Sequence, residues 1–154
     1  MPNPINSSWW HRVIALSDDF AEEIGWPELV ETVARVRDSL PENERQQVAI
    51  LAGNYGEAGA IDLYGPQQGL PRAISGVNSY WARGYGDPPP QVLIVIGFSA
   101  EFVEHYFDEH QVVAEVRNRY NVANEETTQH REIYLCRRLK IPWPDFWRGF
   151  QRFG

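Results

Sequence analysis

The sequence predicts an α/β fold, a single Rossmann-like three-layer domain with a mostly parallel sheet of about five strands. Short apolar runs rich in β-branched residues alternate with segments of helical periodicity. Turns that contain glycine or serine follow the first three of these runs. The chain has 154 residues, of which 43% are hydrophobic, and this suits one domain with a sizeable core.

Residues 1–19 are predicted to form an N-terminal arm, and residues 20–154 the single α/β domain. The arm contains two prolines and the pair Trp9-Trp10, and we expect it to pack on its own domain. The first predicted helix spans residues 27–40, because proline suits its first position and Pro41 ends its apolar periodicity.

The stretch 48–65 is the centre of the predicted fold. Residues 48–52 form an apolar run typical of a buried strand, and a glycine-rich turn and a short helix from Glu57 follow. This order is the first half of a βαβ unit, in which ligands bind at the turn. Glycine allows close approach of a ligand, and the first helical turn attracts anions. The alternative is a tight corner without a ligand.

Four further strands complete the predicted sheet. The run 91–96 is almost wholly β-branched and should lie centrally. Ser99 should cap a helix from residue 100 to about residue 110. A helical turn near the C-terminus carries Trp147 and Phe150. The four strands are predicted at residues 72–75, 91–96, 112–116 and 133–136.

The turns after the first three strands should converge, because the carboxyl ends of parallel strands meet at one edge of a sheet. These turns offer amides, hydroxyls, one carboxylate and aromatic rings, the mixture that carbohydrate recognition needs. Asn and Tyr also stabilise turns, so a structural role is the alternative. The predicted ligand-binding residues are Asn54, Tyr55, Glu57, Asn78, Tyr80 and Trp81.

Several other functions are not expected. The net charge of −7 argues against nucleic-acid binding, since phosphate contacts need clustered Lys and Arg. Glu57 and Asp62 lie five apart and should not form a catalytic carboxylate pair on one helix face. The glycine turn lacks the lysine of a phosphate loop and departs from the dinucleotide fingerprint, so no cofactor is expected.

The histidines and the cysteine do not suggest a reactive site. None of the histidines has ligand spacing with Cys, Asp or Glu, so no metal site is predicted. Cys136 lies in an apolar segment and is expected to be a buried, inert thiol. The histidines are His11, His105, His110 and His130.

Three segments carry a family resemblance. They are ILAGNYGEAGAIDLYGP (50–66), GLPRAISGVNSYWARGYGDPPP (69–90) and the pattern NEE…LCR…PWPDFW (124–147). They resemble the soluble C-terminal region of bacterial glycosyltransferase family 39 proteins, which are similar to protein mannosyltransferases and to the aminoarabinose transferase of lipid A. The resemblance covers roughly residue 20 to the end of the chain.

The resemblance implies an accessory soluble domain on the extracytoplasmic side of the bacterial inner membrane, as part of a membrane protein. The parent transferase would use a polyprenyl-phosphate sugar, and an acidic residue of its membrane portion would serve catalysis. The domain would bind sugar or lipid-linked sugar, or cover the membrane active site. The resemblance assigns no catalytic residue to this chain, which is not expected to transfer sugar alone.

Two alternatives remain at this stage. The first is a structural or interaction module that docks on the membrane portion through tryptophans. The second is an independent Rossmann-like small-molecule-binding protein. The sequence shows no signal peptide and no apolar run of about 20 residues, so the fragment itself is expected to be soluble. The docking tryptophans would be Trp9, Trp10, Trp143 and Trp147.

Overall fold

The computed structural model describes residues 25–117 and 130–153. An open five-stranded sheet with the order β2-β1-β3-β5-β4 forms its centre. The predicted N-terminal arm, with Trp9 and Trp10, lies outside the described residues. The strands are β1 (Ala49–Ala52), β2 (Ala73–Ser75), β3 (Val92–Ile96), β4 (Phe107–Glu115) and β5 (Glu132–Leu139).

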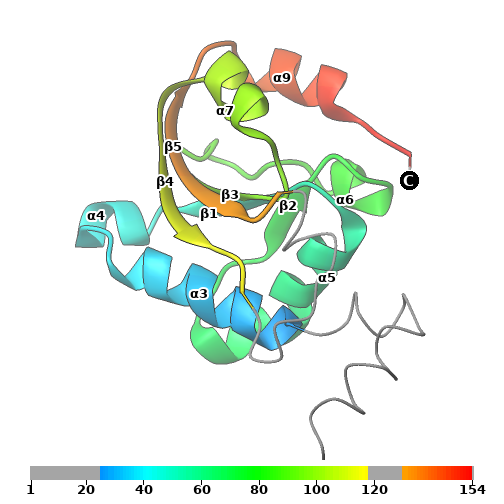
Figure 1. Cartoon of the computed structure of the whole chain (residues 1–154). Helices are drawn as coiled ribbons and strands as arrows, with labels where there is room; N and C mark the ends of the chain where they lie inside the picture. Colours follow the sequence, from blue (N-terminus) through cyan, green and yellow to red (C-terminus); the bar gives the residue numbers. More distant parts are fainter. Residues whose placement is uncertain (1–24, 118–129, 154) are drawn as a thin grey trace, which may run out of the picture.

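Helices cover both faces of the sheet. In Figure 1, α3 and α5 lie below the sheet, and α7 and α9 lie above it. Each face has its own apolar cluster, aliphatic on the side of α3 and α5 and strongly aromatic on the side of α7 and α9. The helices are α3 (Trp26–Asp38), α4 (Glu42–Arg45), α5 (Tyr55–Tyr64), the 3-10 helix η1 (Gly65–Gln68), α6 (Ser79–Ala82), α7 (Ala100–Tyr106) and α9 (Trp143–Phe150).

The prediction of a mixed α/β fold with about five strands is confirmed, whereas a mostly parallel, Rossmann-like sheet is not. β1 pairs in parallel with β2 and with β3. β5 pairs antiparallel with both β3 and β4, and these two ladders include more residue pairs than the parallel ones. The physical reason is that β5 runs back along β4, its neighbour in sequence, and such a return makes the pairing antiparallel.

The helix predicted from residue 100 to about residue 110 is too long. Its N-cap is right, since the Ser99 hydroxyl accepts a hydrogen bond from the amide of Phe102. The helix ends at Tyr106, and β4 begins at Phe107, which is buried and pairs with Leu139. Burial of this phenyl ring in the aromatic cluster and the long ladder with β5 outweigh local helix propensity.

The C-terminal segment closes the aromatic face of the sheet. The four aromatic side chains of α9 recur at helical spacing and are all buried. The Nε1 of Trp143 also donates to the carbonyl of Pro90 at 3.1 Å, which ties α9 to the loop before β3. The buried aromatic residues of α9 are Trp143, Phe146, Trp147 and Phe150.

Candidate functional site

The turn between β1 and α5 is stabilised by its own side chains. The side chain of Asn54 accepts a hydrogen bond from the amide of Glu57 at 2.8 Å. In return, Oε2 of Glu57 accepts from the amides of Gly53 at 3.1 Å and of Asn54 at 3.2 Å, which makes a capping box. Glu57 is only 2% exposed. A carboxylate of the chain therefore takes the amides that a bound anion would need.

The turns after β1 and β3 are in backbone contact. The amide of Gly53 donates to the carbonyl of Ile96 at 3.0 Å, and a side chain on Gly53 would collide with the carbonyl of Gly97. Gly97 itself has a φ of 76°, and a side chain there would collide with the carboxylate of Glu57. These glycines allow close approach of the chain to itself, where the sequence suggested a ligand.

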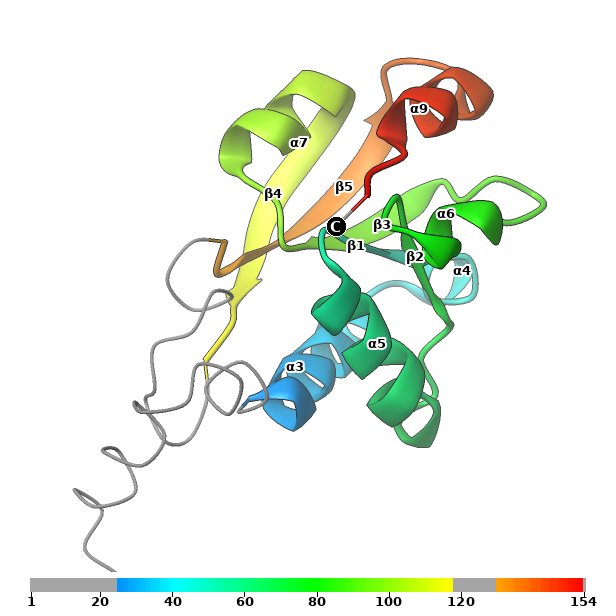
Figure 2. The same cartoon turned by 90° about the vertical axis from the view of Figure 1, so that its right-hand side faces the viewer.

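The turn after β2 is covered by the end of the chain. The amide of Asn78 donates to the carbonyl of Arg152 at 3.0 Å, and the amide of Arg152 donates to the carbonyl of Gly76 at 2.8 Å. A side chain on Gly76 would collide with the carbonyl of Phe150. The chain end lies near α6 in both views (Figures 1 and 2). The backbone of Asn78 thus joins the turn to the segment after α9.

Trp81 and Trp147 are joined by a reciprocal pair of hydrogen bonds. Its Nε1 donates to the carbonyl of Trp147 at 2.7 Å, and the Nε1 of Trp147 donates to the carbonyl of Trp81 at 3.0 Å. The Trp81 ring packs against the aromatic cluster above the sheet. This reciprocal pair fixes α6 to α9, so Trp81 is not an open platform for a sugar.

The rings of two predicted residues, the exposed Tyr55 and the buried Tyr80, are in contact. Tyr55 is 59% exposed, and its ring contacts the Tyr80 ring edge-on with a centroid distance of 5.8 Å and an interplanar angle of 79°. Tyr80 is buried, and the guanidinium carbon of Arg83 lies 4.4 Å from the centroid of its ring. The turns after β1 and β2 therefore meet through aromatic side chains.

Asp62 holds this group together, although the sequence suggested no role for it. Its Oδ2 accepts from Arg83 at 2.8 Å and from the Tyr80 hydroxyl at 3.2 Å, and it forms an ion pair with Arg72 at 3.9 Å. Its Oδ1 accepts from the amide of Ala73 at 2.9 Å, which anchors the carboxylate to β2. We call Tyr55, Asp62, Arg72, Tyr80 and Arg83 the tyrosine–arginine patch.

The protonation states of the patch follow from these contacts. Burial raises the pKa of Tyr80, and the negative charge of Asp62 raises it further. The hydrogen bond to Asp62 raises the pKa of Arg83. At neutral pH the patch therefore presents a neutral phenol beside a charged guanidinium. In the sequence SYWAR, Tyr80 and Arg83 are three positions apart, a spacing that places two side chains close together on a helix and so could have predicted their contact.

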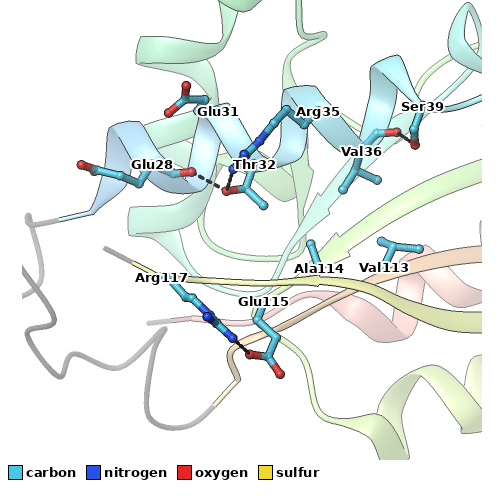
Figure 3. Close-up of a pocket in the computed structure, with 10 residues that line it drawn as sticks. All are labelled: Glu28, Glu31, Thr32, Arg35, Val36, Ser39, Val113, Ala114, Glu115 and Arg117. Carbon is cyan, nitrogen blue, oxygen red and sulfur yellow. Dashed lines mark hydrogen bonds and ion pairs between the residues drawn. The ribbon is translucent and has the colours of Figure 1, made fainter. Parts of the chain in front are cut away.

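Two hollows lie away from the predicted residues. One of about 680 Å³ lies between α3 and β4, where Val36 faces Val113 and Ala114 (Figure 3). Glu115 and Arg117 at its side pair with each other at 3.0 Å. The other, of about 410 Å³, lies beside the end of β5. None of the six predicted ligand-binding residues lines either hollow.

Metal and thiol chemistry find no support in the described part of the chain. Within residues 25–117 and 130–153, no three His, Cys, Asp or Glu side chains are grouped to hold a metal ion. Cys136 is buried, and burial raises the pKa of its thiol to about 12, so it is not a nucleophile at neutral pH. Among the same residues, no helix has the length and hydropathy needed to cross a membrane.

Comparison with known proteins gives no relative for this chain. No family model, curated protein or solved structure matches it.

Proposed function

We propose that this chain is an accessory extracytoplasmic domain of a polyprenyl-phosphate-sugar-dependent glycosyltransferase, and that it recognises sugar at the tyrosine–arginine patch. The resemblance of the segments 50–66, 69–90 and 124–147 to family 39 proteins supports the parent activity. The geometry around Tyr55 supports recognition. The domain binds sugar for the parent enzyme and does not itself break or form the glycosidic bond.

The exposed ring of Tyr55 carries this proposal. An exposed aromatic ring stacks on the apolar face of a sugar, and fixed polar groups beside it bond the sugar hydroxyls. Here the ring of Tyr80 contacts that of Tyr55 edge-on, and Tyr80 is also in contact with Asp62 and Arg83, which provide an acceptor and donors. Because these groups are held by one another, binding costs little side-chain ordering.

The described acids support recognition over catalysis. Sites that hydrolyse glycosidic bonds commonly use two carboxylates that flank the same bond. Glu57 is buried against Gly97, and Asp62 binds two arginines and a tyrosine. The occupied turn after β1 likewise offers no support for an independent small-molecule-binding protein.

A titration with neutral sugars tests the proposed function. We expect millimolar glucose, mannose or arabinose to shift the backbone amide signals of Tyr55, Tyr80 and Arg83 in nuclear magnetic resonance spectra. Tyr55→Ala should abolish the shifts, because it removes the stacking ring. Tyr64→Ala is the matched control, since Tyr64 is a second exposed tyrosine at the opposite end of α5. Absent shifts, or shifts that persist in Tyr55→Ala, would reject sugar recognition at the patch.

Docking on the membrane portion is the second candidate, and the outer face of α5 favours it. Leu63 is 67% exposed, and Tyr64 beside it is also exposed. The tryptophan surface expected from the sequence is not available on α9, because Trp143 and Trp147 are buried.

A charged substitution on α5 tests docking. Leu63→Glu should prevent the chain from co-purifying with a co-expressed membrane portion, because it places a charge in the apolar contact. Glu104→Gln, at an exposed position of α7 on the opposite face of the sheet, is the control. Unchanged co-purification of Leu63→Glu would exclude this face as the docking surface.

A further inference from the structure

We infer that the sugar bound at the tyrosine–arginine patch is an acidic sugar that carries a carboxylate. This inference rests on the proposed function and narrows its substrate class. It follows from the way two arginines share one aspartate beside Tyr80, whose ring contacts the ring of the exposed Tyr55.

Two guanidinium groups converge on a single carboxylate oxygen. Oδ2 of Asp62 lies 2.8 Å from Nη1 of Arg83 and 3.9 Å from Nε of Arg72. The side chain of Asp62 is 18% exposed, whereas those of Arg83 and Arg72 are 43% and 73% exposed. A guanidinium has five N–H donors, so each arginine retains donors that face solvent.

The local charge suits a ligand with one negative charge. Two guanidinium groups against the carboxylate of Asp62 leave a formal charge of about +1 at the patch, in a chain whose net charge is −7. A sugar carboxylate would neutralise this charge. A phosphate monoester brings about −1.5 to −2 and would leave the site negative. The planar guanidinium also matches a carboxylate through two parallel hydrogen bonds.

Arg83, which lies over the ring of Tyr80, is positioned before a ligand arrives. Arg83 lies over Tyr80 and bonds to Asp62, which is itself tied to the amide of Ala73 on β2. Tyr55 touches the same Tyr80 ring edge-on. An acidic sugar can therefore place its apolar face on Tyr55 and its carboxylate toward the arginines, with little reorganisation of the protein.

Competing titrations of the full chain with glucuronate, glucose and glucose 6-phosphate test this inference. Glucuronate should bind about tenfold more tightly than glucose, which is the scale of one hydrogen bond between charged groups. Glucose 6-phosphate should bind more weakly than glucuronate. Added salt should weaken glucuronate binding and leave glucose binding unchanged.

Arg72→Gln and Arg83→Lys separate charge from geometry. Arg72→Gln removes a largely exposed guanidinium that forms a long 3.9 Å ion pair with Asp62, so the fold should be unaffected and the preference for glucuronate should fall severalfold. Arg83→Lys keeps the positive charge but removes the planar guanidinium that can bind a carboxylate through two hydrogen bonds. It should therefore also reduce the preference for glucuronate over glucose. Arg148→Gln, which removes an exposed arginine from α9, is the control and should change nothing.

The outcomes distinguish this inference from the proposed function. Equal affinities for glucuronate and glucose, both lost in Tyr55→Ala, would overturn the acidic-sugar inference and leave sugar recognition standing. Tighter binding of glucose 6-phosphate than of glucuronate would overturn the carboxylate assignment. Binding of none of the three would overturn both proposals. A preference for glucuronate that survives Arg72→Gln and Arg83→Lys would also contradict the inference.

Discussion

At the residue scale, Glu57 shows how a signal for ligand binding can have a structural cause. The sequence places this acid after a glycine turn in the first turn of a helix, where anions bind in related folds. The structure places its carboxylate on the amides of Gly53 and Asn54, under Gly97. The capping pattern Asn54…Glu57 was readable from the sequence, whereas the burial of its carboxylate against Gly97, directly after β3, was not.

Removal of this carboxylate should be costly. Glu57→Ala removes an acceptor that the amides of Gly53 and Asn54 share, and it opens space beside Gly97, so we expect a loss of about 2–4 kcal/mol in the free energy of unfolding. Glu101→Ala, an exposed acid in the first turn of α7, should change stability by less than about 1 kcal/mol. Denaturant unfolding measures both variants. A loss of less than about 1 kcal/mol for Glu57→Ala would contradict the role of its carboxylate in stabilising the turn between β1 and α5.

Asp62 is the residue that sequence reasoning missed. Its partners Tyr80 and Arg83 lie 18 and 21 positions away in the chain, and no local pattern links them. The contact depends on α6 lying against the edge strand β2, beside α5. Such a side-chain group is a product of tertiary packing. The six predicted residues therefore included both tyrosines of the patch and none of its charged groups.

At the element scale, the sequence predicted all five strands, but it underestimated the length of the last two, since the predictions 112–116 and 133–136 fall on the longer β4 (Phe107–Glu115) and β5 (Glu132–Leu139). Residues 48–52, 72–75 and 91–96 are apolar, short and bounded by turns, and each matches an observed strand within a residue or two. β4 begins at Phe107 inside what reads locally as a helix. Its long ladder with β5 determines that strand, and neither the register nor the antiparallel direction is encoded locally.

One ion pair links α4 to β5, and it predicts how the stability of the fold depends on pH. Arg137 of β5 donates to both carboxylate oxygens of Glu44 of α4, at 2.8 and 2.7 Å. This hydrogen bonding lowers the pKa of Glu44 from its usual value of 4.5. A lowered pKa in the folded state stabilises the fold at pH values above 4.5, and the contribution is lost as the pH falls through the folded-state pKa.

The stability of the native chain should therefore depend on pH differently from the stability of Glu44→Gln. The native chain should be more stable than the variant from about pH 6 to 8, and the difference should shrink as the pH falls below about 4.5. Thermal unfolding across this pH range measures the effect, with Glu42→Gln, a neighbouring exposed acid of α4, as the control. A difference that stays constant down to about pH 3 would show that the charge of Glu44 is not responsible.

At the scale of the whole molecule, the chain fills the crevice that its topology would offer to a ligand. Glu57 and paired glycines close the gap between β1 and β3, and the segment after α9 covers the turn after β2. The tyrosine–arginine patch lies beside the β2 edge of the sheet, and its Tyr55, Arg72 and Arg83 are exposed. This arrangement supports surface recognition of a sugar more than an enclosed active site.

Transfer of magnetisation from Tyr55 to a bound sugar tests the central claim most directly. Saturation of the tyrosine ring protons should pass to the C–H protons on the apolar face of glucuronate or glucose, and the transfer should disappear in Tyr55→Ala but persist in Tyr64→Ala. Transfer of equal strength in Tyr55→Ala, or no transfer in the native chain at millimolar sugar, would contradict sugar recognition at this surface.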